Sequence, residues 1–165
     1  MSWAAIAILG FVTLQRLAEL ALSQHNLKRL LAKGAYEVAP EHYPFLVLLH
    51  AFWLAVLWIF GPGPPIHLVP LALFVLLQLG RIWVLATLGE RWTTRIIVLP
   101  GAPLVTSGPY RWVNHPNYLI VIGEIAVLPL VFGLPMVAIV FSLLNAAILY
   151  VRIRAENQAL ETLRR

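Results

Sequence analysis

Five apolar stretches, separated by short polar or turn-rich connections, dominate the chain. The first three approach the roughly 20 residues that a helix needs to cross a bilayer. The last two are shorter, and only Gly133-Leu134 separates them. One helix through both would run about 50 Å, far more than a bilayer core, so we expect a tight helical hairpin. The five stretches are Trp3–Leu22, Tyr43–Phe60, Leu68–Leu88, Tyr118–Phe132 and Pro135–Val151.

The composition agrees with this pattern. Hydrophobic residues make up 61% of the chain and charged residues 12%, whereas soluble domains carry about 25% charged residues. We therefore predict one all-α integral membrane domain over residues 1–165. It has about five transmembrane helices, the last two forming the hairpin, and a short cytoplasmic helix at the C-terminus. The absence of cysteine excludes disulfides and thiolate metal sites. No histidine spacing suggests a metal, and no glycine pattern suggests a phosphate loop.

The basic residues alternate from one connection to the next. Gln24–His42, Gly89–Asn117 and the tail after Val151 carry most of them, while the connections 61–67 and 133–134 have no lysine or arginine. With five spans the basic connections share one side, and the positive-inside rule predicts an external N-terminus and a cytoplasmic C-terminus. The net charge of +5 then reflects topology and attraction to membrane lipids rather than nucleic-acid binding. Arg91 and Arg95 are expected to anchor their loop at lipid head groups.

Each predicted span also carries polar residues near its cytoplasmic end, most of them about 9 Å below the membrane boundary at 1.5 Å per residue. Ionisable groups at this depth are costly unless paired, and they usually mark a functional cavity. Two interpretations stay open: the charges pair to hold the helices together, or they line a pocket for the head group of a lipidic substrate. The residues are Arg16 and Glu19, His50, Gln78 and Arg81, Glu124, and Asn145.

The most informative connection is the turn-rich segment 108–118, Gly-Pro-Tyr-Arg-Trp-Val-Asn-His-Pro-Asn-Tyr. Proline fits the first position of a helix, which needs no backbone donor there, so His115-Pro116 predicts a helix start. Free amides at a helix start attract anions such as the carboxylate of an amino-acid-like cofactor. Its aromatic residues also fit the belt that anchors proteins at the membrane interface. The segment therefore predicts a binding site at the membrane surface.

Ordered motifs in the second half of the chain resemble the isoprenylcysteine carboxyl methyltransferase family, whose wider relatives include phospholipid N-methyltransferases and membrane sterol reductases. The motifs are 104–110, His115–Tyr118, the helical hairpin, and Arg152 followed by Glu156. Upstream, His42-Tyr43-Pro44, His50 and Arg91–Arg95 resemble a bacterial branch associated with alkylpyrone and phenolic-lipid O-methylation. The chain departs from the usual family pattern in two places, with Asn114 before His-Pro and Asn157 after Glu156.

This resemblance implies S-adenosylmethionine as the cofactor, bound by residues 101–165, while the helices of residues 1–100 form the lipid and substrate side. Arg152 would face the acceptor, Arg81 and Glu124 would contribute to substrate binding, and Arg81 would help to orient the reacting group. His50 is a candidate base for a hydroxyl acceptor. The resemblance also places Arg95 near the cofactor. The implied cofactor contacts are Ala102, Pro103, Leu104, Val105, Tyr110, His115, Pro116, Asn117, Tyr118 and Glu156.

The predicted function is thus a membrane O-methyltransferase for a lipidic acceptor, either an isoprenylcysteine-type carboxylate or an alkylpyrone or phenolic-lipid hydroxyl. The expected location is a bacterial cytoplasmic membrane, with the active site on the cytoplasmic side. Arg152 and Glu156 lie one helical turn apart and share a face, which we expect to close against the His115 loop. Two alternatives stay open: a sterol-reductase-type membrane enzyme with a nicotinamide cofactor, and a noncatalytic membrane protein.

Overall fold

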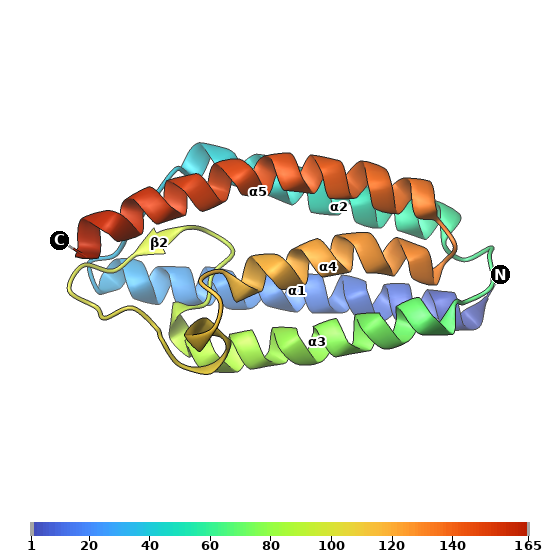
Figure 1. Cartoon of the computed structure of the whole chain (residues 1–165), viewed down its shortest axis with the longest axis horizontal. Coiled ribbons are helices and arrows are strands. Elements are labelled where there is room, and N and C mark those ends of the chain that lie inside the picture. The colour runs from blue at the N-terminus through green and yellow to red at the C-terminus, as the bar shows by residue number, and fades with distance from the viewer. Residues whose placement is uncertain (1, 165) are drawn as a thin grey trace.

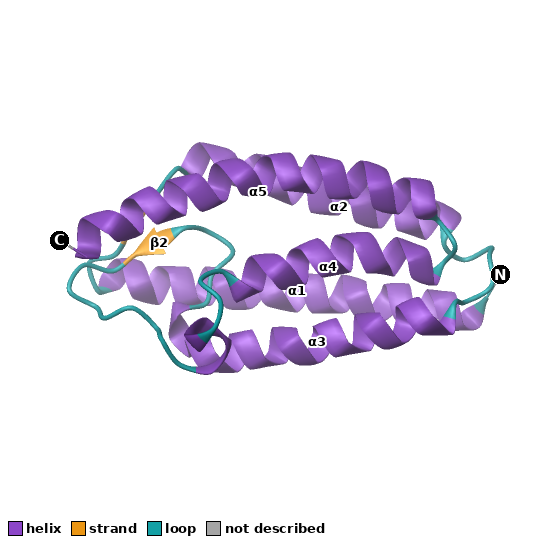
Figure 2. Ribbon diagram, viewed as in Figure 1, coloured by secondary structure: helices purple, strands orange, loops and turns teal. Residues whose placement is uncertain are grey.

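The structure is a computed structural model that describes residues 2–164, with side chains to Glu161. Five long helices form the molecule (Figure 1): α1 (Trp3–Ala32), α2 (Tyr43–Phe60), α3 (Leu68–Leu88), α4 (Pro116–Val131) and α5 (Pro135–Arg164). The other elements are short (Figure 2). They are the antiparallel strands β1 (Tyr36–Glu37) and β2 (Ile97–Val98) and the 3-10 helices η1 (Pro40–His42), η2 (Gly89–Arg91) and η3 (Gly108–Arg111). The all-helical prediction is confirmed.

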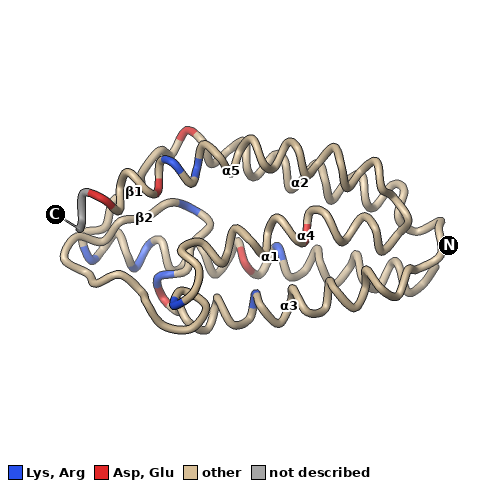
Figure 3. Tube along the Cα trace, viewed as in Figure 1, with Lys and Arg blue, Asp and Glu red and all other residues tan. Residues whose placement is uncertain are grey.

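The helices run up and down in two layers (Figure 1). Helices α2 and α5 lie side by side in one layer, and α4 packs between α5 and α3 while α1 lies beside it. Helices α1, α2, α3 and α5 are long and apolar enough to cross a membrane, and α4 is a shorter apolar helix of 16 residues. The N-terminus and both short turns lie at one end of the bundle. The long connections, the C-terminus and most basic residues lie toward the other (Figure 3).

Helices α2 and α3 have the bounds that the hydrophobic pattern predicts, whereas α1 and α5 are longer. Helix α1 continues past Leu22 to Ala32, because no proline or glycine interrupts it before Gly34, whose φ is +89°. The predicted C-terminal helix is the continuation of α5 to Arg164. An apolar pattern marks where a helix leaves the bilayer, while the backbone remains helical until a residue stops it.

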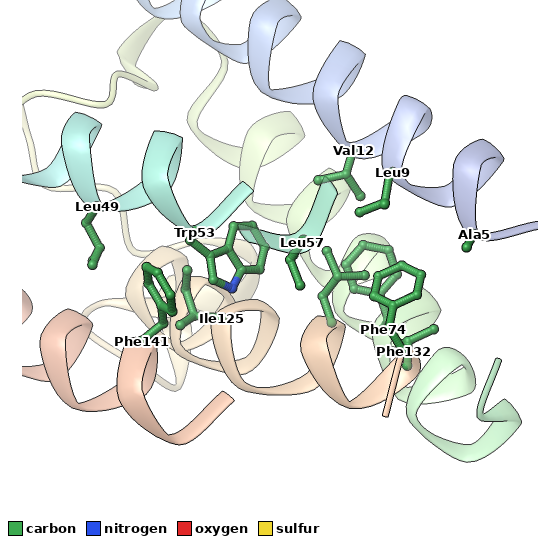
Figure 4. Packing of buried hydrophobic residues seen from close by; sticks show 12 residues of the cluster. Ala5, Leu9, Val12, Leu49, Trp53, Leu57, Phe74, Ile125, Phe132 and Phe141 are labelled. Atoms are coloured by element: carbon green, nitrogen blue, oxygen red, sulfur yellow. The ribbon is translucent and has the colours of Figure 1, made fainter. Parts of the chain in front are cut away.

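The end of the bundle that lacks basic residues is closed by capping and apolar packing. The Ser2 hydroxyl accepts from the Ala5 amide at 3.3 Å, and the Ser2 amide donates to the Pro62 carbonyl at 2.8 Å. The α4–α5 turn needs Gly133, whose φ is +67°. Large side chains from all five helices fill the interior behind these turns (Figure 4), among them Leu9, Trp53, Leu57, Phe74, Leu128, Phe132 and Phe141.

A buried ionic cluster joins α1, α3 and α4 halfway along the bundle. Arg16 donates to Glu19 at 2.9 Å and to Glu124 at 2.5 Å, and Arg81 donates to both carboxylates. Gln78 donates to Glu124 at 2.7 Å. Two guanidinium groups and two carboxylates balance one another, so these four side chains pair, and three of them, Arg16, Glu19 and Arg81, also line a cavity. His50 and Asn145 lie outside this cluster, with no hydrogen bond to its members in the described structure.

Removal of one carboxylate should show how much the ionic cluster contributes to the stability of the protein. Glu124→Gln keeps the shape of the side chain and leaves two buried arginines facing Glu19 alone. We expect the free energy of unfolding in detergent to fall by about 3 to 5 kcal/mol, as when one partner of a buried ion pair is lost. Glu90→Gln is the control, because Glu90 is half exposed and pairs with Arg29 and Lys33 at the surface, where ion pairs contribute little. Equal losses in both variants would contradict a stabilising role for the cluster.

Candidate functional site

A cavity of about 740 Å³ lies between the two helix layers at the end of the bundle that carries the long connections. Its volume falls in the range typical of small-molecule sites. Helices α1, α2 and α5 and the connection between α3 and α4 all contribute to its wall. The predicted substrate side, residues 1–100, and the predicted cofactor core, residues 101–165, therefore meet in one space.

Most of the predicted site residues line this cavity, but two do not. Pro116 is buried at the start of α4, and Glu124 lies behind the guanidinium groups of Arg16 and Arg81, with no exposed surface. Its carboxylate already accepts from three side chains, which leaves it no free face toward the cavity. The predicted residues that do line the cavity are His50, Arg81, Ala102, Pro103, Leu104, Val105, Tyr110, His115, Asn117, Tyr118, Arg152 and Glu156.

The connection before α4 is held against the helices at fixed points. Gly108 has a φ of +55°, and a Cβ there would collide with the Thr87 hydroxyl of α3. Arg91 donates to the Pro103 carbonyl at 2.5 Å, and this bond fixes the part of the connection that precedes Gly108. Burial, followed by the negative charge of Glu156, raises the pKa of the Tyr110 hydroxyl above its usual range. That hydroxyl therefore stays protonated and is available as a donor.

His115 connects the motif segment to α5, as the shared face of Arg152 and Glu156 led us to expect. Its Nε2 donates to Oδ1 of Asn157 at 2.9 Å, and its Nδ1 lies 3.5 Å from Glu156 Oε2. The ring also lies against Tyr118, with 5.5 Å between the ring centroids. Asn157, which departs from the usual family pattern, thus holds the histidine of the motif.

The start of α4 offers fewer free amides than an ordinary helix. Pro116 has no N–H group, and the Tyr118 amide donates to the His115 carbonyl at 3.1 Å. Among the described residues, the Asn117 amide has no backbone acceptor, and the Asn117 Oδ1 atom is buried without a hydrogen-bond partner. The polar groups that this helix start presents to a ligand therefore centre on Asn117.

Arg152 differs from the other buried arginines because no carboxylate neutralises it. Its side chain is 2% exposed, one guanidinium nitrogen donates to the Thr94 carbonyl at 2.9 Å, and its Nε has no partner in the described structure. Arg16 and Arg81, in contrast, each pair with two glutamates. A buried cation without a counterion strongly favours an anionic ligand.

His50 borders the cavity from α2. Its Nδ1 lies 2.9 Å from the Leu46 carbonyl, which can only accept, so Nδ1 carries a proton in this contact. In the neutral ring Nε2 is then the acceptor, as a base requires. The ring also meets Trp53 edge to face, at 6.4 Å between the centroids.

The sequence analysis named the motif Arg91–Arg95, but it did not reveal the contacts of Thr94 within the site. Arg95, expected at the lipid head groups, instead turns inward: it pairs with Glu37 at 2.8 Å and stacks on the Tyr43 ring at 4.1 Å. Thr94 itself bonds to side chains of α1 and α2. The motif Arg91–Arg95 contains these residues, but their partners lie in α1, β1 and α2, and nothing in the local sequence specifies the pairing.

Comparisons with known proteins give the site a family context. The profile of the isoprenylcysteine carboxyl methyltransferase (ICMT) family matches residues 70–162. The uncharacterized protein YpbQ of Bacillus subtilis (strain 168) is 39% identical over 166 residues, covering 98% of this chain and 97% of its own. An uncharacterized protein of Haemophilus influenzae is 31% identical over 157 residues, covering 90% of each chain. No solved structure matches the chain.

Two glycines test how tightly the motif segment docks on α3. Gly108→Ala and Gly101→Ala both place a side chain at a positive φ, at a cost of about 1 kcal/mol, but only the first Cβ meets another residue. We expect Gly108→Ala to lower the melting temperature more and to speed hydrogen exchange in residues 104–112. Equal effects of the two substitutions would mean that the contact with Thr87 does not hold the segment.

Proposed function

The chain belongs to the isoprenylcysteine carboxyl methyltransferase family, and from this premise we propose that it is an S-adenosylmethionine-dependent integral membrane O-methyltransferase with a lipidic acceptor. The observation that carries the proposal is the single cavity that joins the family motif residues to Arg152 and to the apolar wall of α1 and α2. Cofactor and lipid would thus share one enclosed space.

The residues around the motif segment fit this cofactor. Asn117 Oδ1 and Glu156 Oε2 are buried acceptors without hydrogen-bond partners in the described structure, and they suit the ammonium group and the ribose hydroxyls. The Asn117 amide suits the carboxylate, the neighbouring His115 and Tyr118 rings suit the adenine, and the apolar stretch 102–105 would cover it. When bound, S-adenosylmethionine supplies an electrophilic methyl group on a sulfonium. The protein then has to orient the acceptor and exclude water.

The other part of the cavity suits an amphiphile with an oxygen head group. We assign Arg152 to hold the acceptor oxygen in its anionic form, because its buried charge has no counterion among the described residues. Leu17, Val47 and Leu54 offer an apolar wall for a lipid tail. A carboxylate needs only this orientation, whereas a hydroxyl also has to lose a proton, for which Nε2 of His50 is the proposed acceptor. Both acceptor classes fit these residues.

The ionic cluster forms the wall behind this head-group region. Arg81 lines the cavity, but Glu19 and Glu124 neutralise it. We therefore propose that Arg81 presents to the acceptor a polar surface whose charge Glu19 and Glu124 balance. Glu124 acts through Arg81, as its counterion, instead of touching the acceptor.

We further propose that the cavity faces the cytoplasm. The basic residues gather toward the end of the bundle that carries the long connections (Figure 3), and the turns at the other end carry none. By the positive-inside rule this arrangement corresponds to an external N-terminus. The soluble cofactor would then enter from the cytoplasm and the acceptor from the surrounding membrane.

Cofactor binding is the first test of this function. Calorimetry on detergent-purified protein should detect S-adenosylmethionine binding, and Glu156→Ala should weaken the affinity at least about tenfold through the loss of a hydrogen bond to a charged group. Glu41→Ala, at an exposed carboxylate outside the cavity, should bind like the wild type. No heat of binding in folded wild-type protein would refute the proposal, and binding of a nicotinamide nucleotide instead would favour a reductase.

Arg152 is the residue with the largest expected effect on turnover. Membranes that contain the Arg152→Ala variant should transfer at least about 100-fold less labelled methyl group into extracted lipid, because a buried charge contact to the acceptor is worth about 3 kcal/mol. Arg154→Ala is the matched control, since Arg154 lies on the same helix and bonds only to Tyr150 at the surface. Wild-type inside-out vesicles should react with added cofactor, and sealed right-side-out vesicles should not. Normal turnover in Arg152→Ala would remove this residue from the acceptor site.

A further inference from the structure

We propose that Thr94 is a positioning residue that fixes the guanidinium group of Arg152 in the cavity. This inference rests on the proposed function, because it assigns Thr94 a role in orienting the residue that holds the acceptor. Thr94 itself need not touch the substrate. Its hydroxyl bonds the nonhelical stretch around residue 94 to α1 and α2. Its carbonyl accepts a hydrogen bond from the Arg152 guanidinium, so the position of Thr94 affects the orientation of that group.

The contact with Arg152 comes from the backbone of Thr94. One guanidinium nitrogen donates to the Thr94 carbonyl at 2.9 Å, and Arg152 forms no ion pair with any described carboxylate. A long side chain with several rotatable bonds has many orientations unless its head group is bound. The Thr94 carbonyl is therefore one of the contacts, together with the Tyr118 hydroxyl, that direct the Arg152 head group.

The position of that carbonyl is set by side chains, because residue 94 belongs to no helix or strand. The Thr94 amide donates to the Ser23 hydroxyl at 2.9 Å, and the Thr94 hydroxyl shares hydrogen bonds with Ser23 at 2.8 Å and Tyr43 at 3.1 Å. Ser23 lies on α1 and Tyr43 on α2. Residue 94 is therefore joined to three helices at once, counting α5 through Arg152.

The residues beside Thr94 are fixed in the same way. Asn26 of α1 is buried, and its amide group donates to the carbonyls of Gly89 at 3.2 Å and Trp92 at 2.8 Å. On the other side, Arg95 pairs with Glu37 and stacks on Tyr43. With both neighbours held, loss of the Thr94 hydroxyl leaves the chain path intact and frees only the local orientation at residue 94. A substitution at residue 94 therefore tests its positioning role without disrupting the fold.

The neighbouring threonine provides the contrast. Thr93 also borders the cavity, but its hydroxyl donates at 2.7 Å to the Arg95 carbonyl within the same stretch, and it reaches neither α1 nor α2. Thr93→Val and Thr94→Val make the same chemical change one residue apart. Only the second removes hydrogen bonds between elements.

The kinetic test compares Thr94→Val, Thr94→Ser and Thr93→Val, with labelled S-adenosylmethionine and an extract of membrane lipids as the acceptor pool. We expect Thr94→Val to lower turnover at saturating cofactor about tenfold, as a small misplacement of an orienting group does. Its cofactor affinity, measured by calorimetry, should stay within about twofold of the wild type, and Thr94→Ser should restore turnover. Thr93→Val should lower turnover much less than Thr94→Val does. Equal turnover in Thr94→Val and Thr93→Val, or a matching loss of cofactor affinity, would overturn the proposal.

A second measurement needs no cofactor. Melting temperatures of the wild type, Thr94→Val, Arg152→Met and the double variant form a cycle that reports coupling between the two residues. We expect Thr94→Val to cost less stability when Arg152 is already replaced, and additive shifts would overturn the proposal. If the wild type neither binds S-adenosylmethionine nor methylates lipid, the proposed function fails, while the cycle still decides whether Thr94 positions Arg152.

Discussion

The need to neutralise charge inside a membrane is the constraint on which this structure depends. Arg16 and Arg81 lie on different helices at a depth where an unpaired guanidinium is expensive, and Glu19 and Glu124 satisfy both. Since Glu124 sits on α4, the pairing fixes that short helix against α1 and α3. The α4–α5 hairpin then brings α5 to its place beside α2. The ionic cluster thereby holds together α1, α3 and α4, the layer that lies opposite α2 and α5.

Arg152 is as deeply buried in the cavity wall as Arg81, but no described carboxylate pairs with it. Arg152 is held by a carbonyl, a partner that orients a guanidinium without cancelling its charge. Buried cations of this kind need an anionic partner, and the cavity gives one access. The contrast distinguishes the paired arginines Arg16 and Arg81 from Arg152, for which we propose a role in binding the acceptor.

Contacts between distant parts of the chain bring the family motifs together in space. His115 and Glu156 are separated by the whole hairpin, yet their side chains lie 3.5 Å apart. Asn157, which departs from the usual family pattern, bonds to His115 and so takes part in the same closure. Gly108 docks the preceding turn on Thr87 of α3. These contacts bring the segment 108–118 against α3 and α5, beside the cavity.

The sequence by itself determined the helical class, the bounds of α2 and α3, the hairpin and a set of site residues, most of which line one cavity. It did so because a bilayer imposes helices of known length and because the motif residues follow a recognisable order. The ends of α1 and α5 were missed, since apolar patterning stops where the bilayer does. Only the tertiary structure decided which charges cancel, why Glu124 stays behind the wall, and how Ser23 and Tyr43 hold Thr94, whose carbonyl accepts from Arg152. Hydrogen bonds between helices depend on how the helices rotate and pack, and no local stretch of the sequence specifies that geometry.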